Sequence, residues 1–396
     1  MGQSRSNNLT LRYGLYQFTF FLSCAGIFGF ATTYLVANGF TAAQVGAIIA
    51  ASYFVACILQ PFLGGFADRF PWIGLPKLII LCLGLSFASF TVIQFCHLPQ
   101  AVFGALYAVG GLLITVTVSV NNALCVFYSE RGYAINYGIG SGIGSLSYSV
   151  STFGMGYVIA YLGTDFMIWV VLLSLSLQII ITLGYPKISQ GKESFLAQST
   201  EMHDKGQRVS LVSFFFKYKF FTLTILGAMP IAMCHSMAEN YLFQMFLPMG
   251  GSSQHVGAAL AIASFSAAPF LLLFEKVQKK IDITLLMRLS GVFYILKAVL
   301  MFFASSIWQV YAIVCLQTVT YGFIYPSLFY FAKMKIDKED MAKGQAVAVA
   351  AFTLGTALGS LVGGKAVDAF GFSAMILIAG ALAAFGTIII NSSINK

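Results

Sequence analysis

Two charged side chains in the second half of the sequence, Glu239 and Lys297, each interrupt a long apolar stretch. If such a stretch crosses a bilayer, a charge at its centre costs about 2.5–3.5 kcal/mol on insertion scales, so a retained charge usually faces a polar cavity and has a partner. His235 precedes Glu239 by one helical turn, which places the two side chains on one helix face. These three residues are therefore the candidates for binding and moving a proton.

Glu239 is the expected proton-binding carboxylate. Burial favours its neutral form and a nearby Lys297 favours its anion, so its proton affinity can change with its surroundings. The alternative interpretation is a fixed structural ion pair between two helices. His235 either relays protons or binds substrate, or it is a structural histidine bonded to backbone or hydroxyl groups.

Amide and phenol side chains within apolar stretches are the candidates for binding a substrate. They form directional hydrogen bonds without the desolvation cost of full charges, which suits a neutral polyol, sugar, nucleoside or aromatic solute better than a phosphate. The candidates are Tyr13, Tyr16, Gln17, Asn121, Asn122, Tyr148, Asn240, Tyr241, Gln317, Tyr321 and Tyr325. With 19 tyrosines in the chain, any single one is better explained as a packing or membrane-interface residue, so the stronger candidates are Asn121, Asn122 and Gln317.

The elements that position these residues are membrane-spanning helices. Hydrophobic residues make up 59% of the 396-residue chain, charged residues 9%, and the mean hydropathy is +0.85. A span needs about 20 mostly apolar residues with every backbone polar group bonded internally. The pattern predicts an all-α membrane protein with spans at 12–37, 42–63, 76–96, 99–126, 135–162, 164–185, 219–246, 253–274, 283–304, 306–332, 342–365 and 370–391.

The basic residues predict the orientation of these spans. With the N-terminus inside, all 22 lysines and arginines except Lys297 and Lys365 fall on the cytoplasmic side. We therefore expect a multi-pass protein of the cytoplasmic (inner) membrane with both termini cytoplasmic and the first span retained. Topology and the anionic lipid surface explain the net charge of +9, so no nucleic-acid partner is expected. The seven cysteines lack a C-x-x-C spacing, and no metal or cofactor is expected.

A polar stretch near the middle of the chain predicts two halves. We assign residues 1–185 to an N-terminal six-helix bundle, 186–218 to a cytoplasmic linker and 219–396 to a C-terminal six-helix bundle. Gln44-Val-Gly-Ala47 and His255-Val-Gly-Ala258 open corresponding spans about 210 residues apart, which indicates an internal repeat. Small residues at four-residue spacing in spans two, five, eight and eleven predict close helix packing.

The loop after the second span carries Gly64-Gly-Phe-Ala-Asp68-Arg69 and then Gly74-Leu-Pro-Lys77. This resembles the G-x-x-x-D-R/K-x-G-x-R/K-K/R motif of the major facilitator superfamily, at the same cytoplasmic loop. The resemblance covers essentially the whole chain and implies two pseudo-symmetric six-helix bundles. It also implies a gating role for Gly64, Asp68 and Arg69, although a solvated turn with ordinary topology charges is the alternative.

Within that superfamily the chain is most similar to the lactose permease group of oligosaccharide:proton symporters and to aromatic-acid relatives. Gln60-Pro61, Tyr137-Gly138 and the polar residues of spans seven, nine and ten carry this resemblance, and Glu239 and Lys297 match an acidic and a basic position of the group. However, Ser141 stands where the group has a sugar-binding arginine, and amides replace its acidic partner on span four. No galactoside is therefore carried over as substrate.

The resemblance implies alternating access around a cavity lined by spans one, four, seven and ten. We expect a monomeric secondary transporter whose partners are the lipid bilayer, protons and a small-molecule substrate, and whose activity is proton-coupled import of a solute such as a saccharide. The alternatives are proton-driven efflux of hydrophobic compounds and a non-transporting receptor or scaffold. No hydrolase, metalloprotease or phosphate-loop motif indicates an enzyme.

Overall fold

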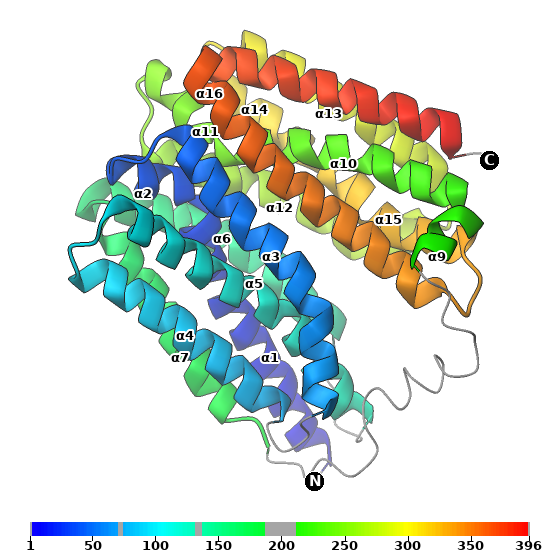
Figure 1. Ribbon diagram of the computed structural model, residues 1–396, viewed down its shortest axis with the longest axis horizontal. Coiled ribbons are helices and arrows are strands. Elements are labelled where there is room, and N and C mark those ends of the chain that lie inside the picture. The colour runs from blue at the N-terminus through cyan, green and yellow to red at the C-terminus, as the bar shows by residue number, and fades with distance from the viewer. Residues whose placement is uncertain (1, 70–73, 131–136, 187–210, 395–396) are drawn as a thin grey trace.

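The computed structural model describes residues 2–69, 74–130, 137–186 and 211–394 (Figure 1). Within these ranges the chain is helical, with no strand. A helix bonds its own backbone groups, which is what a chain crossing hydrocarbon requires. The expected all-helical fold is therefore confirmed.

The first bundle contains the helices that precede the middle of the chain. In order they are α1 (Gly2–Cys24), a π-helical turn η1 (Ala25–Gly29), α2 (Ala31–Ala37), α3 (Ala42–Arg69), α4 (Leu75–Phe95), α5 (Gln100–Glu130), α6 (Tyr137–Leu162) and α7 (Phe166–Leu183). They pack on one another as α1 with α6 and α7, α3 with α5, and α4 with α5 and α7.

The second bundle contains the remaining helices. In order they are α9 (Leu211–Lys217), α10 (Lys219–Asn240), α11 (Leu242–Phe246), η2 (Leu247–Met249), α12 (Ser253–Val277), α13 (Ile283–Phe303), α14 (Ile307–Val314), η3 (Cys315–Thr318), α15 (Tyr321–Lys335) and α16 (Met341–Ser393). The short helix α9 lies within the expected linker 186–218, most of which falls outside the described residues.

The described residues contain nine helices long and apolar enough to cross a membrane, or ten if the bent pair α1–α2 counts as one span. Helix α16 is long enough to cross twice, and Gly371 within it has φ 78° and ψ 173°, where two helices meet. Such a positive φ is accessible to glycine because it lacks a Cβ. Together with α6, which matches the predicted span 135–162, this arrangement is consistent with the predicted twelve spans.

Three spans predicted as continuous are broken. Span one bends at Phe30 after η1, span seven breaks at Tyr241, and span ten passes through η3 before α15 begins. The breaks do not coincide with the prolines inside α10 and α15, Pro230 and Pro326. Hydropathy cannot reveal them because a broken span is as apolar as a continuous one.

The two bundles meet mainly through α3 with α16 and through α6 with α12. The glycine of each repeated V-G pattern lies at this interface: a Cβ on Gly46 would be 2.2 Å from the carbonyl oxygen of Ser360, and one on Gly257 would be 2.5 Å from that of Thr152. These two glycines therefore allow backbone contact between the bundles.

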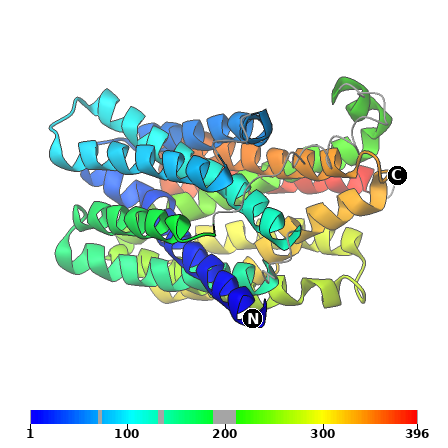
Figure 2. The ribbon, with the colours of Figure 1, turned by 90° about the horizontal axis from the view of Figure 1, so that it is seen from below.

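Polar contacts join the bundles at one end of the molecule. The Asp368 carboxylate accepts hydrogen bonds from the backbone N–H groups of Ala42 (3.0 Å) and Ala43 (2.8 Å), and so caps the N-terminus of α3. Nearby, the Thr32 hydroxyl donates to the Asn240 carbonyl. We call this the joined end; α1 begins and α16 ends at the opposite end (Figures 1 and 2).

Candidate functional site

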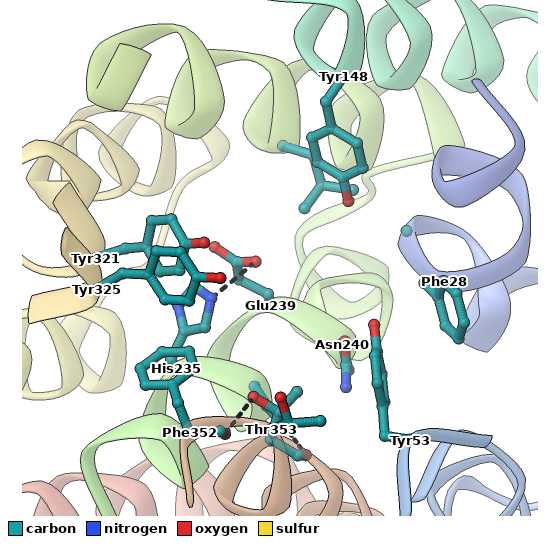
Figure 3. A pocket seen from close by; sticks show the side chains of 14 residues that line it. Phe28, Tyr53, Tyr148, His235, Glu239, Asn240, Tyr321, Tyr325, Phe352 and Thr353 are labelled. Carbon is teal, nitrogen blue, oxygen red and sulfur yellow. Dashed lines mark hydrogen bonds and ion pairs between the residues drawn. The ribbon is translucent and has the colours of Figure 1, made fainter. Parts of the chain in front are cut away.

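A cavity of about 220 Å³ lies between the bundles and is lined by both (Figure 3). The first bundle contributes Phe28 and Gly29 from η1, Tyr53 from α3 and Tyr148 from α6. The second contributes side chains from α10, α12, α15 and α16. A ligand here would contact both halves of the molecule at once.

Aromatic rings form two opposing sides of the cavity (Figure 3). On the side of the second bundle, the Tyr321 ring stacks on Tyr325 and on His235, each with 5.0 Å between centroids. The Phe352 ring meets Tyr325 edge-on at 5.4 Å. On the side of the first bundle, Phe28 stacks on Tyr53 at 4.9 Å. The cavity therefore offers aromatic surfaces to a ring-shaped solute, with few charged groups between them.

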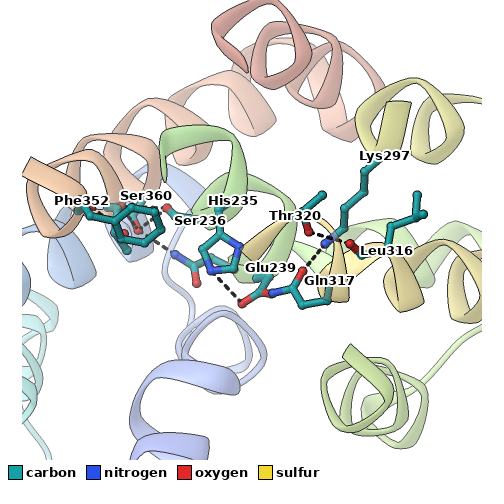
Figure 4. A network of polar contacts seen from close by, with 11 residues as sticks. His235, Ser236, Glu239, Lys297, Leu316, Gln317, Thr320, Phe352 and Ser360 are labelled. Carbon is teal, nitrogen blue, oxygen red and sulfur yellow. Dashed lines mark hydrogen bonds and ion pairs between the residues drawn. The ribbon is translucent and has the colours of Figure 1, made fainter. Parts of the chain in front are cut away.

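Glu239 is the only carboxylate among the described residues that line the cavity. One of its oxygens accepts a hydrogen bond from the Gln317 amide, and the other lies 3.6 Å from His235 Nε2 (Figure 4). The predicted shared face of His235 and Glu239 is thus observed. Lys297 does not pair directly with Glu239: its Nζ donates to Gln317 Oε1 at 2.7 Å, so one amide separates the lysine from the carboxylate.

The break in span ten positions Gln317. The chain leaves the α-helix after Val314, and Thr320 adopts φ −93° and ψ −89° before α15 begins. The Ser290 hydroxyl of α13 donates to the Thr320 carbonyl at 2.9 Å and satisfies a backbone group at the break. A short 3₁₀ segment inside a helix often marks a hinge.

The break in span seven connects the cavity to the joined end. Glu239 and Asn240 both line the cavity, and the Asn240 amide also donates to Ser360 Oγ at 2.7 Å. The next residue, Tyr241, donates its hydroxyl to the Ser360 carbonyl. Three consecutive residues therefore link the carboxylate to the contact between α3 and α16.

The predicted site residues fall into groups. Six of them line the cavity: His235, Glu239, Tyr148, Asn240, Tyr321 and Tyr325. Lys297 and Gln317 are buried behind Glu239, at 2% and 5% exposure. Another five are not among the described lining residues: Tyr13, Tyr16, Asn121 and Tyr241 are buried in the helix packing, and Gln17 is partly buried on α1. The side chains of Asn122, Gly64, Asp68 and Arg69 lie outside the described residues.

The candidates on span one that do not line the cavity show that polar residue type and spacing are not enough to identify lining residues. Gln17 donates to the Tyr13 hydroxyl at 2.8 Å, one turn away on the same helix, rather than into the cavity. The cavity instead receives Phe28 and Gly29 from the π-helical turn further along this span. A search for polar residues passes over such apolar positions.

Spans two and eleven also supply lining residues that sequence reasoning did not select. They are Tyr53 on α3 and Phe352, Thr353 and Thr356 on α16. The cavity thus extends beyond the four spans that the resemblance implied. Among the described residues, no cluster of histidine, cysteine, aspartate and glutamate could hold a metal ion.

Known proteins similar to this chain are transporters. The sequence profile of the MFS_1 like family matches residues 10–377. An uncharacterized transporter of Bacillus subtilis (strain 168), YwbF, is 24% identical over 329 residues, which cover 81% of this chain and 76% of the relative.

Solved transporter structures share the fold at low sequence identity. The nucleoside transporter NupG has a TM-score of 0.74 at 15% identity and covers 98% of both chains. A D-xylose-proton symporter has a TM-score of 0.71 at 14% identity and covers 97% of both. Given the profile match across nearly the whole chain and the two helical bundles around a shared cavity, this protein belongs to the MFS_1 like family of major facilitator superfamily transporters.

Proposed function

We propose that this transporter imports a small neutral organic solute together with a proton, by alternating access, with Glu239 as the proton site. The observation that carries the proposal is the position of Glu239: its carboxylate lines the cavity between the bundles and contacts both His235 and Gln317. A carboxylate that is partly hydrated in one conformation and enclosed in the other changes its affinity for a proton between the two.

The residues around Glu239 support a simple proton cycle. The ionised carboxylate accepts the charge-assisted hydrogen bond from the Gln317 amide. A proton from water in the cavity reaches Glu239 directly or through His235 Nε2, 3.6 Å away. Neutral Glu239 no longer holds a charge in the enclosed cavity, which lowers the cost of moving the loaded site away from water.

The cavity lining supports a neutral, ring-bearing substrate such as a sugar, a nucleoside or a neutral aromatic metabolite. Ring faces stack on the outer ring of the His235–Tyr321–Tyr325 stack or on the Phe28–Tyr53 pair, while Asn240 and the tyrosine hydroxyls bond polar edges. The solved relatives named for nucleosides and D-xylose agree with this class. At 14–15% identity they indicate a shared fold and do not select one solute.

We further propose that the protein resides in the cytoplasmic membrane as a monomer with both termini cytoplasmic. In that orientation the joined end faces outward, and the conformation described here is closed to the outside. The distribution of lysines and arginines supports this topology.

Efflux of hydrophobic compounds is the second candidate, because the stacked aromatic lining would also bind them. Import and efflux predict different phenotypes when the gene is deleted. Deletion of an exporter raises intracellular dye, whereas deletion of an importer causes a growth defect on one nutrient.

The proposal is tested in proteoliposomes with an imposed pH gradient. A thermal-shift screen of the purified protein against sugars, nucleosides and aromatic acids first identifies the solute to be used. Glu239→Gln should abolish uphill uptake while solute exchange at equal pH continues, because the amide cannot carry a proton. Glu275→Gln, an exposed carboxylate at the end of α12, is the matched control and should behave as wild type. Undiminished uphill uptake by Glu239→Gln would exclude this carboxylate as the proton site.

A further inference from the structure

Three side chains from three different elements form a continuous hydrogen-bonded chain behind the cavity (Figure 4). Lys297 of α13 donates to Gln317 of η3, and Gln317 donates to Glu239 of α10. Lys297 and Gln317 are buried, and neither is among the described residues lining the cavity. A substrate in the cavity would therefore meet Glu239 without touching the two groups behind it.

The chemistry of the amide allows this chain in only one orientation. An amide has an acceptor end and a donor end, an ammonium group only donates, and an ionised carboxylate only accepts. With its oxygen toward Lys297, Gln317 has its N–H group directed at Glu239. The reverse orientation would set donor against donor on one side and acceptor against acceptor on the other. Lys297 therefore determines which end of the amide faces the carboxylate.

We propose that Gln317 is a positioning residue for proton binding: oriented by Lys297, it holds Glu239 as the anion, and protonation of Glu239 loosens this link between α10 and η3. The inference rests on the proposed function, because Glu239 must exchange a proton. Loss of the charge weakens the hydrogen bond, since charge-assisted bonds are about twice as strong as neutral ones. Because Gln317 lies in the 3₁₀ break, the loosened bond lies at the point where span ten departs from regular α-helix.

Other titratable groups surround this chain and belong in any account of its pH dependence. Within electrostatic range of Glu239 are His235 on its own helix, Tyr53 of α3, Tyr148 of α6, Tyr294 of α13 and Tyr321 of α15. Lys297 also has Cys234 of α10 nearby. None of these takes the place of Gln317 between Lys297 and Glu239, so substitutions at the amide isolate its contribution.

The experiment measures protonation of Glu239 directly and needs no substrate. Purified protein is reconstituted in lipid, and the infrared band of protonated carboxylic acids is recorded as the pH is changed. The component of this band that disappears in Glu239→Gln belongs to Glu239, and its midpoint is the pH at which half of it is lost. Gln317→Met, which deprives the anion of its donor, should move the band's midpoint upward by about one pH unit or more, a roughly tenfold or greater gain in proton affinity. Lys297→Met should move it in the same direction, because the amide is then free to turn.

The double variant Lys297→Met with Gln317→Met tests whether the lysine acts through the amide. Its midpoint should move no further than that of Gln317→Met alone. Gln178→Met is the matched control: Gln178 is a buried glutamine bonded to Ser23 at 2.8 Å, away from Glu239, so its loss should lower the melting temperature and leave the midpoint unchanged.

Several outcomes would overturn the inference. An unchanged midpoint in Gln317→Met would make the amide merely structural, and additive shifts would mean that Lys297 acts on Glu239 by charge alone. A lowered midpoint would mean that the lysine closes onto the carboxylate and that Gln317 is only a spacer. If Gln317→Met does not fold, Gln317→Asn, whose amide is too short to reach both partners, should give the same upward shift, and no shift would overturn the inference.

The infrared measurement also separates this inference from the proposed function. Suppose that the midpoint rises in Gln317→Met and in Lys297→Met and rises no further in the double variant, while Glu239→Gln keeps full uphill uptake. That result would support the amide link and overturn the proposed function. Loss of uphill uptake in Glu239→Gln together with an unchanged midpoint in Gln317→Met would support the proposed function and overturn the amide link. If no titrating band disappears in Glu239→Gln over the pH range in which the protein is folded, both are wrong.

Discussion

At the scale of single residues, the Glu239 carboxylate lies between the cavity on one side and a buried hydrogen-bonded amide on the other. It faces the cavity, where solute and water can reach it, and it also accepts a hydrogen bond from an amide that is itself anchored to a buried lysine. A buried charge without a partner would be strongly destabilising. The partner here is separated from it by one amide, so the pair is linked without direct contact.

The Tyr321 ring lies at the centre of the aromatic side of the cavity, stacked between His235 and Tyr325. Tyr321→Ala should weaken binding of the solute identified by the thermal-shift screen by about two- to tenfold, because Tyr325 loses the ring that supports it and a stacked ring contributes about 0.5–1.5 kcal/mol. Tyr321→Phe should retain most of the affinity if the ring face carries the interaction. Equal losses in both variants, measured by calorimetry, would assign the interaction to the hydroxyl instead.

Asp340 lies in the loop before α16, and its surroundings should make the stability of the folded protein depend on pH. Burial alone would raise the pKa of Asp340, but hydrogen bonds from Lys217 (3.0 Å), Lys343 (3.2 Å) and Tyr218 (3.1 Å) outweigh burial and hold the pKa below its ordinary value. A carboxylate with a lowered folded pKa contributes stability above its unfolded pKa, and this contribution is lost as the pH falls through the folded value.

To test the contribution of the Asp340 charge, the melting temperatures of wild type and Asp340→Asn are compared over a range of pH. The wild type should be the more stable at neutral pH, and the difference should shrink as the pH falls below the ordinary aspartate pKa of 3.8. A difference that stays constant down to the acid limit would mean that the charge of Asp340 contributes nothing.

At the scale of elements, the broken spans carry the site. Spans one, seven and ten each depart from regular α-helix near the cavity, with Phe28 in the π-helical turn, Asn240 at the last residue of α10 and Gln317 in η3. Each break is stabilised by side chains of neighbouring helices, as Ser290 does for Thr320. Irregular backbone at this depth is tolerated where protein surrounds it or where it lines a cavity.

The start of α3 provides a prediction at this scale. Asp368→Ala should weaken the joined end by about 1 kcal/mol, the usual contribution of a helix cap, because two backbone N–H groups lose their acceptor. Electron–electron distances between spin labels at the exposed residues His97 and Ser305, in a background without native cysteines, should then show a larger open population. Asp165→Ala is the control, because Asp165 precedes α7 without a side-chain cap bond. An unchanged distance distribution in Asp368→Ala would show that the cap does not contribute to closure.

At the scale of the whole molecule, two helical bundles meet through glycines at one end and share a cavity further in. A Cβ on Gly364 would lie 2.2 Å from the carbonyl oxygen of Ala42, so α3 and α16 cannot keep this contact with any larger residue. Gly364→Ala should therefore favour the conformation in which the joined end is open, at a cost to the closed one of about 1–3 kcal/mol.

The same spin-label pair measures this shift. Gly154→Ala is the matched control, because a Cβ at that position meets no atom within 4 Å and should change nothing. If Gly364→Ala keeps the wild-type distance distribution, the glycine contact does not govern the equilibrium between the two conformations.

The sequence by itself determined the class of protein and the approximate positions of the spans, and it singled out Glu239 and Lys297 as candidates. These are local properties, because the free energy of placing a segment in lipid sums over adjacent residues, and a charge in an apolar stretch is exceptional wherever the stretch packs. The repeated glycines at Gly46 and Gly257 were likewise visible as a pattern, and both lie at the interface between the bundles.

Only the tertiary structure decided which side chains meet. Phe28, Tyr53 and Phe352 line one cavity although they lie on three different spans, and Gln17 bonds to Tyr13 and is not among the lining residues although it is polar. Lys297 reaches Glu239 only through Gln317. The rotation of each helix about its axis and the position of each break depend on packing against segments distant in the chain, and local composition carries no information about either.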